Sequence, residues 1–393
     1  MCYYFYMDKY SIINAKIVLK DTIVENSSLL VIDGIIMDIG GEAQGEVIDA
    51  NGMYLAPGFI DMHIHGAGGY GSDLNITQEN LASMVSFLES KGITTFNLAT
   101  CCSLSMLEKM KTYLEASSYL AEHVAGVYFE GPFINPEKKG GLPIDSISKP
   151  NISYLNEILS YKVDGKPIVR VMTVAPELEG ADEIIKILNQ NKVRVAFGHS
   201  MTDYTTASNY SGVHITHLYN AQRGLDHKKP GIALYPFVDK EATYELICDG
   251  VHVDLDLVDF TLSTIKPNRH CLISDGMSFC GLGAGKGKYL GKDIYSDGKA
   301  CYYSDNNVLI GSACLITETG KNLVKRSVLT IPELFVSSSL NPAKVLGLSD
   351  RGQIKKGLRA DLILLDDELN VQRVFKAYNP GLKMLSECSR CCN

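Results

Sequence analysis

The chain has 393 residues and a net charge of −8, from 37 basic and 45 acidic residues. Its length exceeds the usual single-domain size, and an apolar fraction of 46% provides for a large core. The acidic balance argues against nucleic acids and anionic membranes as partners. No stretch approaches about 18 uninterrupted apolar residues, so we expect no transmembrane helix.

The 11 cysteines lie mostly in apolar contexts, such as Cys248 in "ELICDG" and Cys271 in "HCLISD". This usage indicates reduced, buried thiols in a cytoplasmic protein rather than a disulfide framework. The terminal "CSRCC" (388–392) has metal-ligand residues but no second cluster nearby, which favours a tail without a metal. The opening "MCYYFY" does not resemble a signal peptide, and we expect Met7 to be the true start.

Both ends of the chain are rich in short β-strand patterns. Residues 10–56 contain "KIVL", "SLLVID" and "GIIMDIG" separated by turn residues, and the last part contains "RADLILLD" and "VQRVFKAY". A similar texture at both ends of a different middle predicts one small β-sandwich domain, formed by residues 1–56 and 346–393.

The middle of the chain, residues 57–345, alternates apolar strands with helical patterns such as 80–92 and 180–192. The predicted strands are 58–64, 93–99, 124–130, 168–174, 194–199, 213–217, 244–250 and 271–275. Eight strand–helix units of this length predict a (β/α)8 TIM-type barrel. The glycine-rich "GLGAGKG" (281–287) lacks the phosphate-loop spacing, and we expect a flexible surface connection there, followed by hairpins.

Polar side chains lie at the ends of five predicted strands. In "DMHIH", His63 and His65 are two residues apart, so a strand would point both imidazoles to the same face. The other four ends carry an acid or a histidine, and with His65 the five are His65, Glu130, His199, His217 and Asp275. Active sites of such barrels lie at the carboxyl ends of the strands, so these residues should meet. Imidazole and carboxylate groups in one place predict a site for divalent metal.

A divalent ion in this setting activates water and polarises a carbonyl group. Asp275, alone on the last strand, is placed to accept the proton of the water and pass it to a leaving amine. No G-x-S-x-G nucleophile motif occurs. The reaction class is therefore metal-assisted hydrolysis of an amide or related bond. We expect one or two ions, with zinc favoured over iron, cobalt or manganese.

Several motifs carry a resemblance to a known family. "PGFIDMHIHG", "FEGPFINPEKKGG", "VAPE", "FGHS", "THLYNA", "DGVHV", "ISDGM" and "LIGSA" occur in this order between residues 10 and 375. Together they resemble the N-acetylglucosamine-6-phosphate deacetylases of the amidohydrolase superfamily. The resemblance implies removal of the N-acetyl group of N-acetyl-D-glucosamine 6-phosphate, giving D-glucosamine 6-phosphate and acetate in amino-sugar catabolism.

The resemblance also implies roles for single residues. Glu130, His199 and His217 would hold the main metal, His63 and His65 would hold a second, and Asp275 would act as base and then acid. The sugar and its phosphate would contact Gly141, Asn220, Ala221, Lys228, His252, Leu309, Ile310 and Gly311. The family further suggests a homodimer.

Two positions depart from the family pattern. Many members carry a histidine that polarises the acetyl carbonyl where this chain has Leu142, and an arginine where it has Lys228. A second metal at His63 and His65 could replace the missing histidine. Two alternatives therefore stay open: an amidohydrolase of another N-acyl sugar, such as N-acetylgalactosamine 6-phosphate, or of another N-acyl substrate, and a catalytically silent metal-binding relative.

Overall fold

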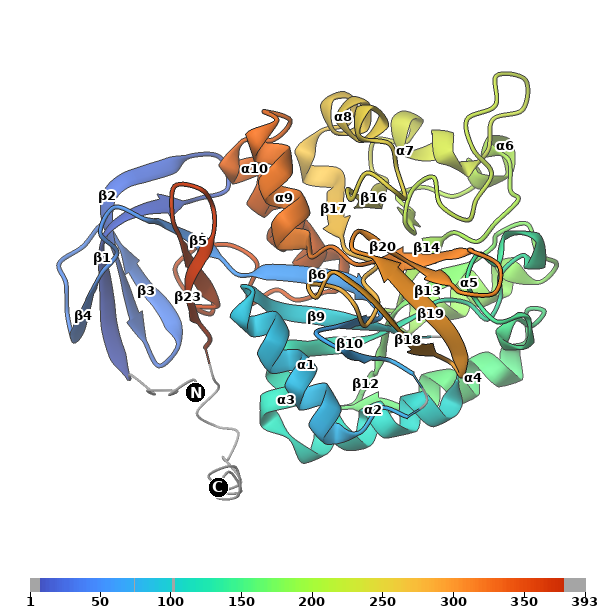
Figure 1. Cartoon of the computed structure of the whole chain (residues 1–393), viewed down its shortest axis with the longest axis horizontal. Helices are drawn as coiled ribbons and strands as arrows, with labels where there is room; N and C mark the ends of the chain where they lie inside the picture. The colour runs from blue at the N-terminus through green and yellow to red at the C-terminus, as the bar shows by residue number, and fades with distance from the viewer. Residues whose placement is uncertain (1–7, 74, 101–102, 378–393) are drawn as a thin grey trace.

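The computed structural model describes residues 8–73, 75–100 and 103–377. The predictions for Met7 and for the "CSRCC" tail fall on residues outside these ranges. Figure 1 shows two parts: a group of strands built from the blue and red ends of the chain, and a larger part in which helices surround strands.

The larger part contains the predicted barrel of eight parallel strands. Hydrogen bonding places them in the order β6, β9, β10, β13, β14, β15, β16 and β17. Their bounds are β6 (Phe59–Ile64), β9 (Ile93–Thr100), β10 (Val124–Phe129), β13 (Val169–Val174), β14 (Arg194–Phe197), β15 (His214–Ile215), β16 (Thr243–Ile247) and β17 (His270–Ile273). The ring closes just beyond β6 and β17, where the backbone N–H of His65 donates to the carbonyl of Gly276 at 2.8 Å.

Helices follow the barrel strands along the chain and pack on their outer side. They are α1 (Gln78–Ser90), α2 (Leu104–Ala116), α3 (Ser118–His123), α4 (Ile152–Ser160), α5 (Ala181–Gln190), α6 (Tyr204–Ala207), α7 (Tyr235–Val238), α8 (Leu255–Thr264), α9 (Ile316–Lys325), α10 (Ile331–Phe335) and α11 (Asn341–Val345). Their sequences explain this placement. In α5 the buried Ile184, Ile185 and Leu188 recur at helical spacing, so one stripe faces the strands. Thr77 caps α1 by accepting a hydrogen bond from the backbone of Asn80.

The smaller part is the predicted β domain from both ends of the chain, and its strands form one mixed sheet of seven. They are β1 (Lys9–Val18), β2 (Ile23–Ile32), β3 (Ile35–Ile39), β4 (Glu46–Asp49), β5 (Tyr54–Pro57), β22 (Leu362–Leu365) and β23 (Val371–Phe375). β22 runs antiparallel to β5, with Leu362 opposite Pro57. β23 lies at the edge of this sheet next to β22, in the same part of Figure 1 as the N-terminal strands. The boundaries at residues 56 and 346 stay predictions.

A separate four-stranded antiparallel sheet is inserted between β17 and α9. Its strands are β18 (Ala284–Tyr289), β19 (Lys292–Asp297), β20 (Ala300–Tyr303) and β21 (Leu309–Ser312). The expectation of a flexible connection at 281–287 was therefore wrong, because β18 begins at Ala284. Gly285 is needed there: a Cβ atom on it would lie 2.5 Å from the Phe279 ring. Buried Leu142, Met277 and Tyr289 pack together beneath this sheet.

Short elements complete the chain. They are β7 (Gly66–Ala67), β8 (Tyr70–Gly71), β11 (Lys162–Val163), β12 (Lys166–Pro167), the 3-10 turns Pro136–Lys138, Ile144–Ser146, Ile232–Leu234 and Pro267–Arg269, and a π-helical turn, Val336–Leu340. Each helix in the ranges given above is too short or too polar to cross a membrane.

Candidate metal centre

The barrel brings the five predicted strand-end residues together at one rim. His65 and Glu130 directly follow β6 and β10, while His199, His217 and Asp275 lie two residues beyond their strands. The last three adopt left-handed backbone conformations, with φ of 46°, 23° and 50°. Non-glycine residues adopt this conformation at a cost of about 1–3 kcal/mol, and such strain concentrates at functional sites.

One group of ligand atoms is formed by Glu130, His199 and His217. Glu130 Oε1 lies 2.9 Å from the Nε2 atoms of both histidines, which are themselves 3.1 Å apart. The Nδ1 atom of His199 donates to the backbone carbonyl of Lys138 at 2.7 Å. This bond fixes the ring so that Nε2 faces the group.

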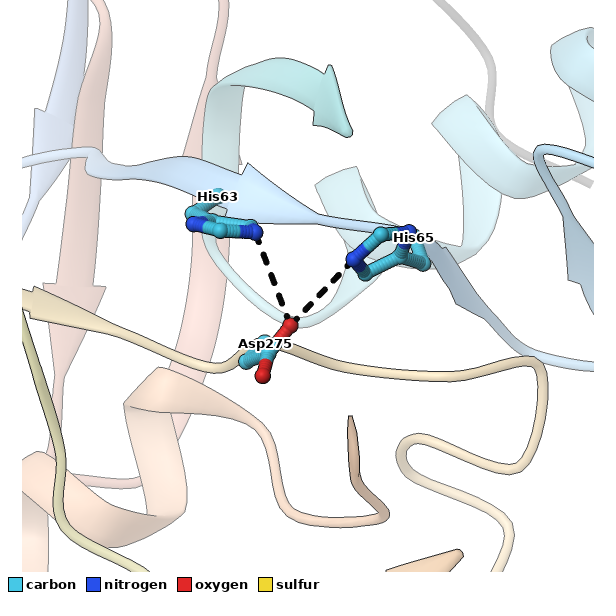
Figure 2. A group of neighbouring side chains, drawn as sticks. All are labelled: His63, His65 and Asp275. Atoms are coloured by element: carbon cyan, nitrogen blue, oxygen red, sulfur yellow. Dashed lines mark ion pairs between the residues drawn. The ribbon is translucent and has the colours of Figure 1, made fainter. Parts of the chain in front are cut away.

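A second group is formed by His63, His65 and Asp275 (Figure 2). Asp275 Oδ1 lies 3.6 Å from Nε2 of His63 and 3.3 Å from Nε2 of His65, and both rings point toward it. Glu130 joins the two groups, because its second oxygen, Oε2, is 3.4 Å from Nε2 of His65. Asp275 thus lies beside His63 and His65, the predicted ligands of the second metal. It also lies in the place expected of the predicted base.

The chemistry of both groups fits divalent metal ions. Each group offers three nitrogen or oxygen atoms within 4.8 Å of one another, all from buried residues. Nε2 of His63 is buried and has no hydrogen-bond partner among the described residues. Burial lowers the pKa of His63, but Glu245, Asp275 and Glu130 outweigh burial and raise the pKa to about 10. The carboxylates around the imidazoles carry excess negative charge, which favours the binding of a cation at this site.

Glu245, which sequence analysis missed, forms hydrogen bonds to one residue of each histidine group. This fully buried side chain on β16 has Oε2 3.0 Å from Nδ1 of His63 and accepts a hydrogen bond from the backbone of His217 at 3.0 Å. Its other oxygen lies 3.2 Å from Nε2 of His214. Burial raises the pKa of Glu245, but His63 and His214 outweigh it and hold the pKa well below its usual range. The available signal was a glutamate inside the apolar run "YELIC".

A cavity of about 240 Å³ opens over the centre. Six of the eight predicted sugar and phosphate contacts line it: Gly141, Asn220, Ala221, His252, Leu309 and Ile310. Leu142 and Tyr289 line it too. His252 is oriented by Asp249, whose Oδ2 lies 2.7 Å from its Nδ1.

Two of the eight predicted contacts, Lys228 and Gly311, lie outside the cavity lining. Lys228 is exposed, and neither it nor the buried Gly311 lines the cavity. Lys228 lies in a loop where its backbone N–H donates to Oδ1 of Asp226 at 2.8 Å. The backbone N–H of Asn220 donates to the carbonyl of His217 at 2.9 Å, so this group is already engaged within the turn. The contact roles of these residues stay predictions.

A parallel barrel with a carboxylate-bridged histidine cluster at its rim defines a class of metal-binding hydrolase scaffolds. The family model described as "Amidohydrolase family" matches residues 54–384. The chain therefore belongs to the amidohydrolase family.

Within that family, the predicted resemblance to the N-acetylglucosamine-6-phosphate deacetylases is confirmed. The enzyme of that name from Bos taurus is 29% identical over 344 residues, which is 83% of each chain. The N-acetylgalactosamine-6-phosphate deacetylase of Escherichia coli O157:H7 is 28% identical over 90% of this chain and 94% of its own. The crystal structure of N-acetylglucosamine-6-phosphate deacetylase from Thermotoga maritima is 31% identical, has a TM-score of 0.81, and is matched over 93% of this chain and 98% of its own.

Proposed function

We propose that this chain hydrolyses the N-acetyl group of N-acetyl-D-glucosamine 6-phosphate, releasing acetate and D-glucosamine 6-phosphate. The observation that carries the proposal is the pair of histidine groups joined by Glu130, with Asp275 facing the same cavity. Deacetylases of amino-sugar phosphates with sequence identities of 28–31% support the substrate class.

The metal would be held by Glu130, His199 and His217, with a second ion at His63 and His65. A bound divalent ion lowers the pKa of water and polarises a carbonyl group. Burial raises the pKa of Asp275, but His65 and His63 outweigh it and lower the pKa to about 2, so the carboxylate is ionised and able to accept a proton.

Asp275 accepts the proton as water adds to the carbonyl carbon, and it then donates that proton to the sugar nitrogen as the C–N bond breaks. Leu142 lines the cavity but offers no hydrogen-bond donor to the carbonyl oxygen. The sugar would contact Gly141 and Leu309, and the 6-phosphate would contact Ala221 and His252, all of which line the cavity.

N-acetylgalactosamine 6-phosphate is the alternative substrate. The deacetylase of that sugar matches this chain at 28% identity over 90% of its length, about as well as the N-acetylglucosamine enzymes do. The two sugars differ only in the configuration of one hydroxyl group.

Acetate release from both sugars, with and without the 6-phosphate, tests the proposal. We expect metal-reconstituted protein to hydrolyse N-acetylglucosamine 6-phosphate fastest and Asp275→Asn to lower kcat by about 10²–10⁴-fold. Metal content measured by atomic emission shows whether each variant still holds the ions. No turnover by metal-loaded wild-type protein on any of the four sugars would contradict the proposal.

A further inference from the structure

A second cavity, of about 300 Å³, adjoins the metal-centred cavity. The two share His65 and Tyr289 as lining residues, so these side chains stand between them. The rest of its wall comes from the β7–β8 turn, the segment after β17, and β18. Neither the sequence motifs nor the proposed reaction gives this space a role.

Backbone hydrogen bonds hold the walls of this second cavity in place. The backbone of Gly69 donates to the carbonyl of Ser278 at 2.8 Å, and Gly66 donates to Gly276 at 2.7 Å, which fixes the β7–β8 turn to the segment after β17. Tyr289 is 8% exposed and ends β18, and its ring lies edge-on to that of His65 at 6.4 Å. The space is therefore a fixed part of the site.

The role of the second cavity depends on the direction in which the proposed substrate lies. Ala221 and His252, which would face the phosphate, line only the first cavity. His65, which lies 3.3 Å from Asp275 at the centre of the reaction, lines both. In the proposed function the phosphate lies toward Ala221 and His252, so we infer that the acyl group is directed toward His65 and Tyr289, the two residues that line both cavities.

The lining of the second cavity suits a short carbon chain. Met277, Phe279 and Tyr289 offer apolar contacts, and Lys286 and Lys288 on β18 bring methylene stems. Asp73 also lines the cavity, and Nζ of Lys288 pairs with Oδ1 of Asp293 at 3.5 Å, so Lys286 is the lysine that would meet a terminal carboxylate. Resting on the proposed function, we propose that this cavity is an acyl subsite, and that the chain accepts amino-sugar phosphates whose N-acyl group is longer than acetyl.

The test compares kcat/KM for N-acetyl-, N-butyryl- and N-succinyl-glucosamine 6-phosphate with metal-loaded protein. The butyryl and succinyl groups have four carbons each, and the second carries a terminal carboxylate that would meet Lys286. We expect at least one of them to be hydrolysed within about tenfold of the acetyl substrate. Each buried methylene is worth about fourfold in binding, which offsets the loss of freedom of the longer chain.

The variant Ser278→Leu places a larger side chain on the wall of the second cavity. We expect it to lower the ratio of four-carbon to acetyl kcat/KM by about tenfold. Ser304→Leu is the matched control, because Ser304 is exposed at the end of β20 and lines neither cavity. Product inhibition gives a second measurement: butyrate should inhibit more strongly than acetate in wild-type protein and lose this advantage in Ser278→Leu.

The outcomes separate the two proposals. If the acetyl substrate is hydrolysed but both four-carbon substrates fall far below a tenth of its kcat/KM, the acyl subsite is wrong while the deacetylase proposal stands. A ratio unchanged in Ser278→Leu also overturns the subsite. If the wild-type protein hydrolyses none of the three substrates, the proposed function itself has failed.

Discussion

Glu245 contacts one ligand residue from each histidine group, and this makes it a single point of support for both. Its Oε2 atom binds the imidazole of His63 and the backbone N–H of His217. Because the carboxylate accepts from Nδ1 of His63, the other ring nitrogen faces the centre in the form that can bind a metal.

The variant Glu245→Gln should therefore weaken metal binding without removing any ligand. We expect the affinity for the second ion to fall about 10- to 100-fold, which is the usual effect of losing such a supporting group. Equilibrium dialysis with Zn²⁺ measures this directly. Glu241→Gln is the control, because Glu241 is exposed just before the same strand. Equal affinities in the two variants would show that Glu245 does not orient His63.

The meeting of the candidate ligands at one rim was predictable from the sequence, whereas the support from Glu245 was not. His65, Glu130, His199, His217 and Asp275 each follow an apolar strand, and His63 lies two residues before His65 within β6, so parallel strand ends predict that these residues meet. Glu245 lies inside a strand, and its partners come from β6 and β15. Such contacts depend on how the strands pair around the barrel, which a single sequence does not reveal.

At the scale of elements, β22 and β23 are attached to the barrel through a buried ion-pair network around Asp361. This carboxylate lies 2.8 Å from Nζ of Lys376 and 3.6 Å from both Arg351 and Arg359. Lys376 also donates to the carbonyl of Thr94 on β9. Burial raises the pKa of Asp361, but these three cations outweigh it and hold the pKa well below its usual range.

Removing the charge of Asp361 leaves three buried or half-buried cations without their shared partner. We expect Asp361→Asn to lower the free energy of unfolding by about 3–5 kcal/mol, measured by urea denaturation. Asp367→Asn is the comparison, because Asp367 pairs with Lys16 at 2.8 Å but its side chain is 80% exposed. That change should cost less than about 1 kcal/mol. Similar losses in both variants would count against a role for the buried network.

All eight barrel strands were predicted, with ends that differ from the observed ones by up to three residues, because apolar runs bounded by turns and polar ends define them. The strand β18 was not predicted, because its sequence "AGKGKY" contains glycines, which usually interrupt strands. The Phe279 ring covers these glycines and supplies the contacts that side chains normally give. This packing is a tertiary effect and has no local signal.

At the scale of the whole molecule, the barrel separates chemistry at one rim from stability at the other. His270 begins β17 at the end opposite Asp275, and its Nε2 donates to the carbonyl of Ile265 at 2.7 Å. Asn341 donates to the carbonyl of His270 at 2.7 Å, so this histidine sits within a fixed hydrogen-bond arrangement.

Burial lowers the pKa of His270 from 6.5 to about 4. Between these two pH values His270 binds a proton in the unfolded chain but not in the folded protein. The contribution of neutral His270 to stability is therefore complete above pH 6.5 and is lost as the pH falls through 4. The loss is roughly 3 kcal/mol. We expect the free energy of unfolding of metal-loaded protein to fall over this range, and His270→Gln to make the decline shallower. An identical pH dependence in the variant would contradict this assignment.

The pairing of β22 with β5 has a consequence for synthesis of the chain. β5 ends at Pro57 and leads directly into β6, the first barrel strand, while its neighbour β22 begins at Leu362. A ribosome must therefore translate about 300 further residues before the edge of β5 finds its partner. During that time an unpaired strand edge stays open beside a growing barrel, a state prone to wrong pairing. The sheet of the small domain is therefore completed only after β22 and β23 have been synthesised.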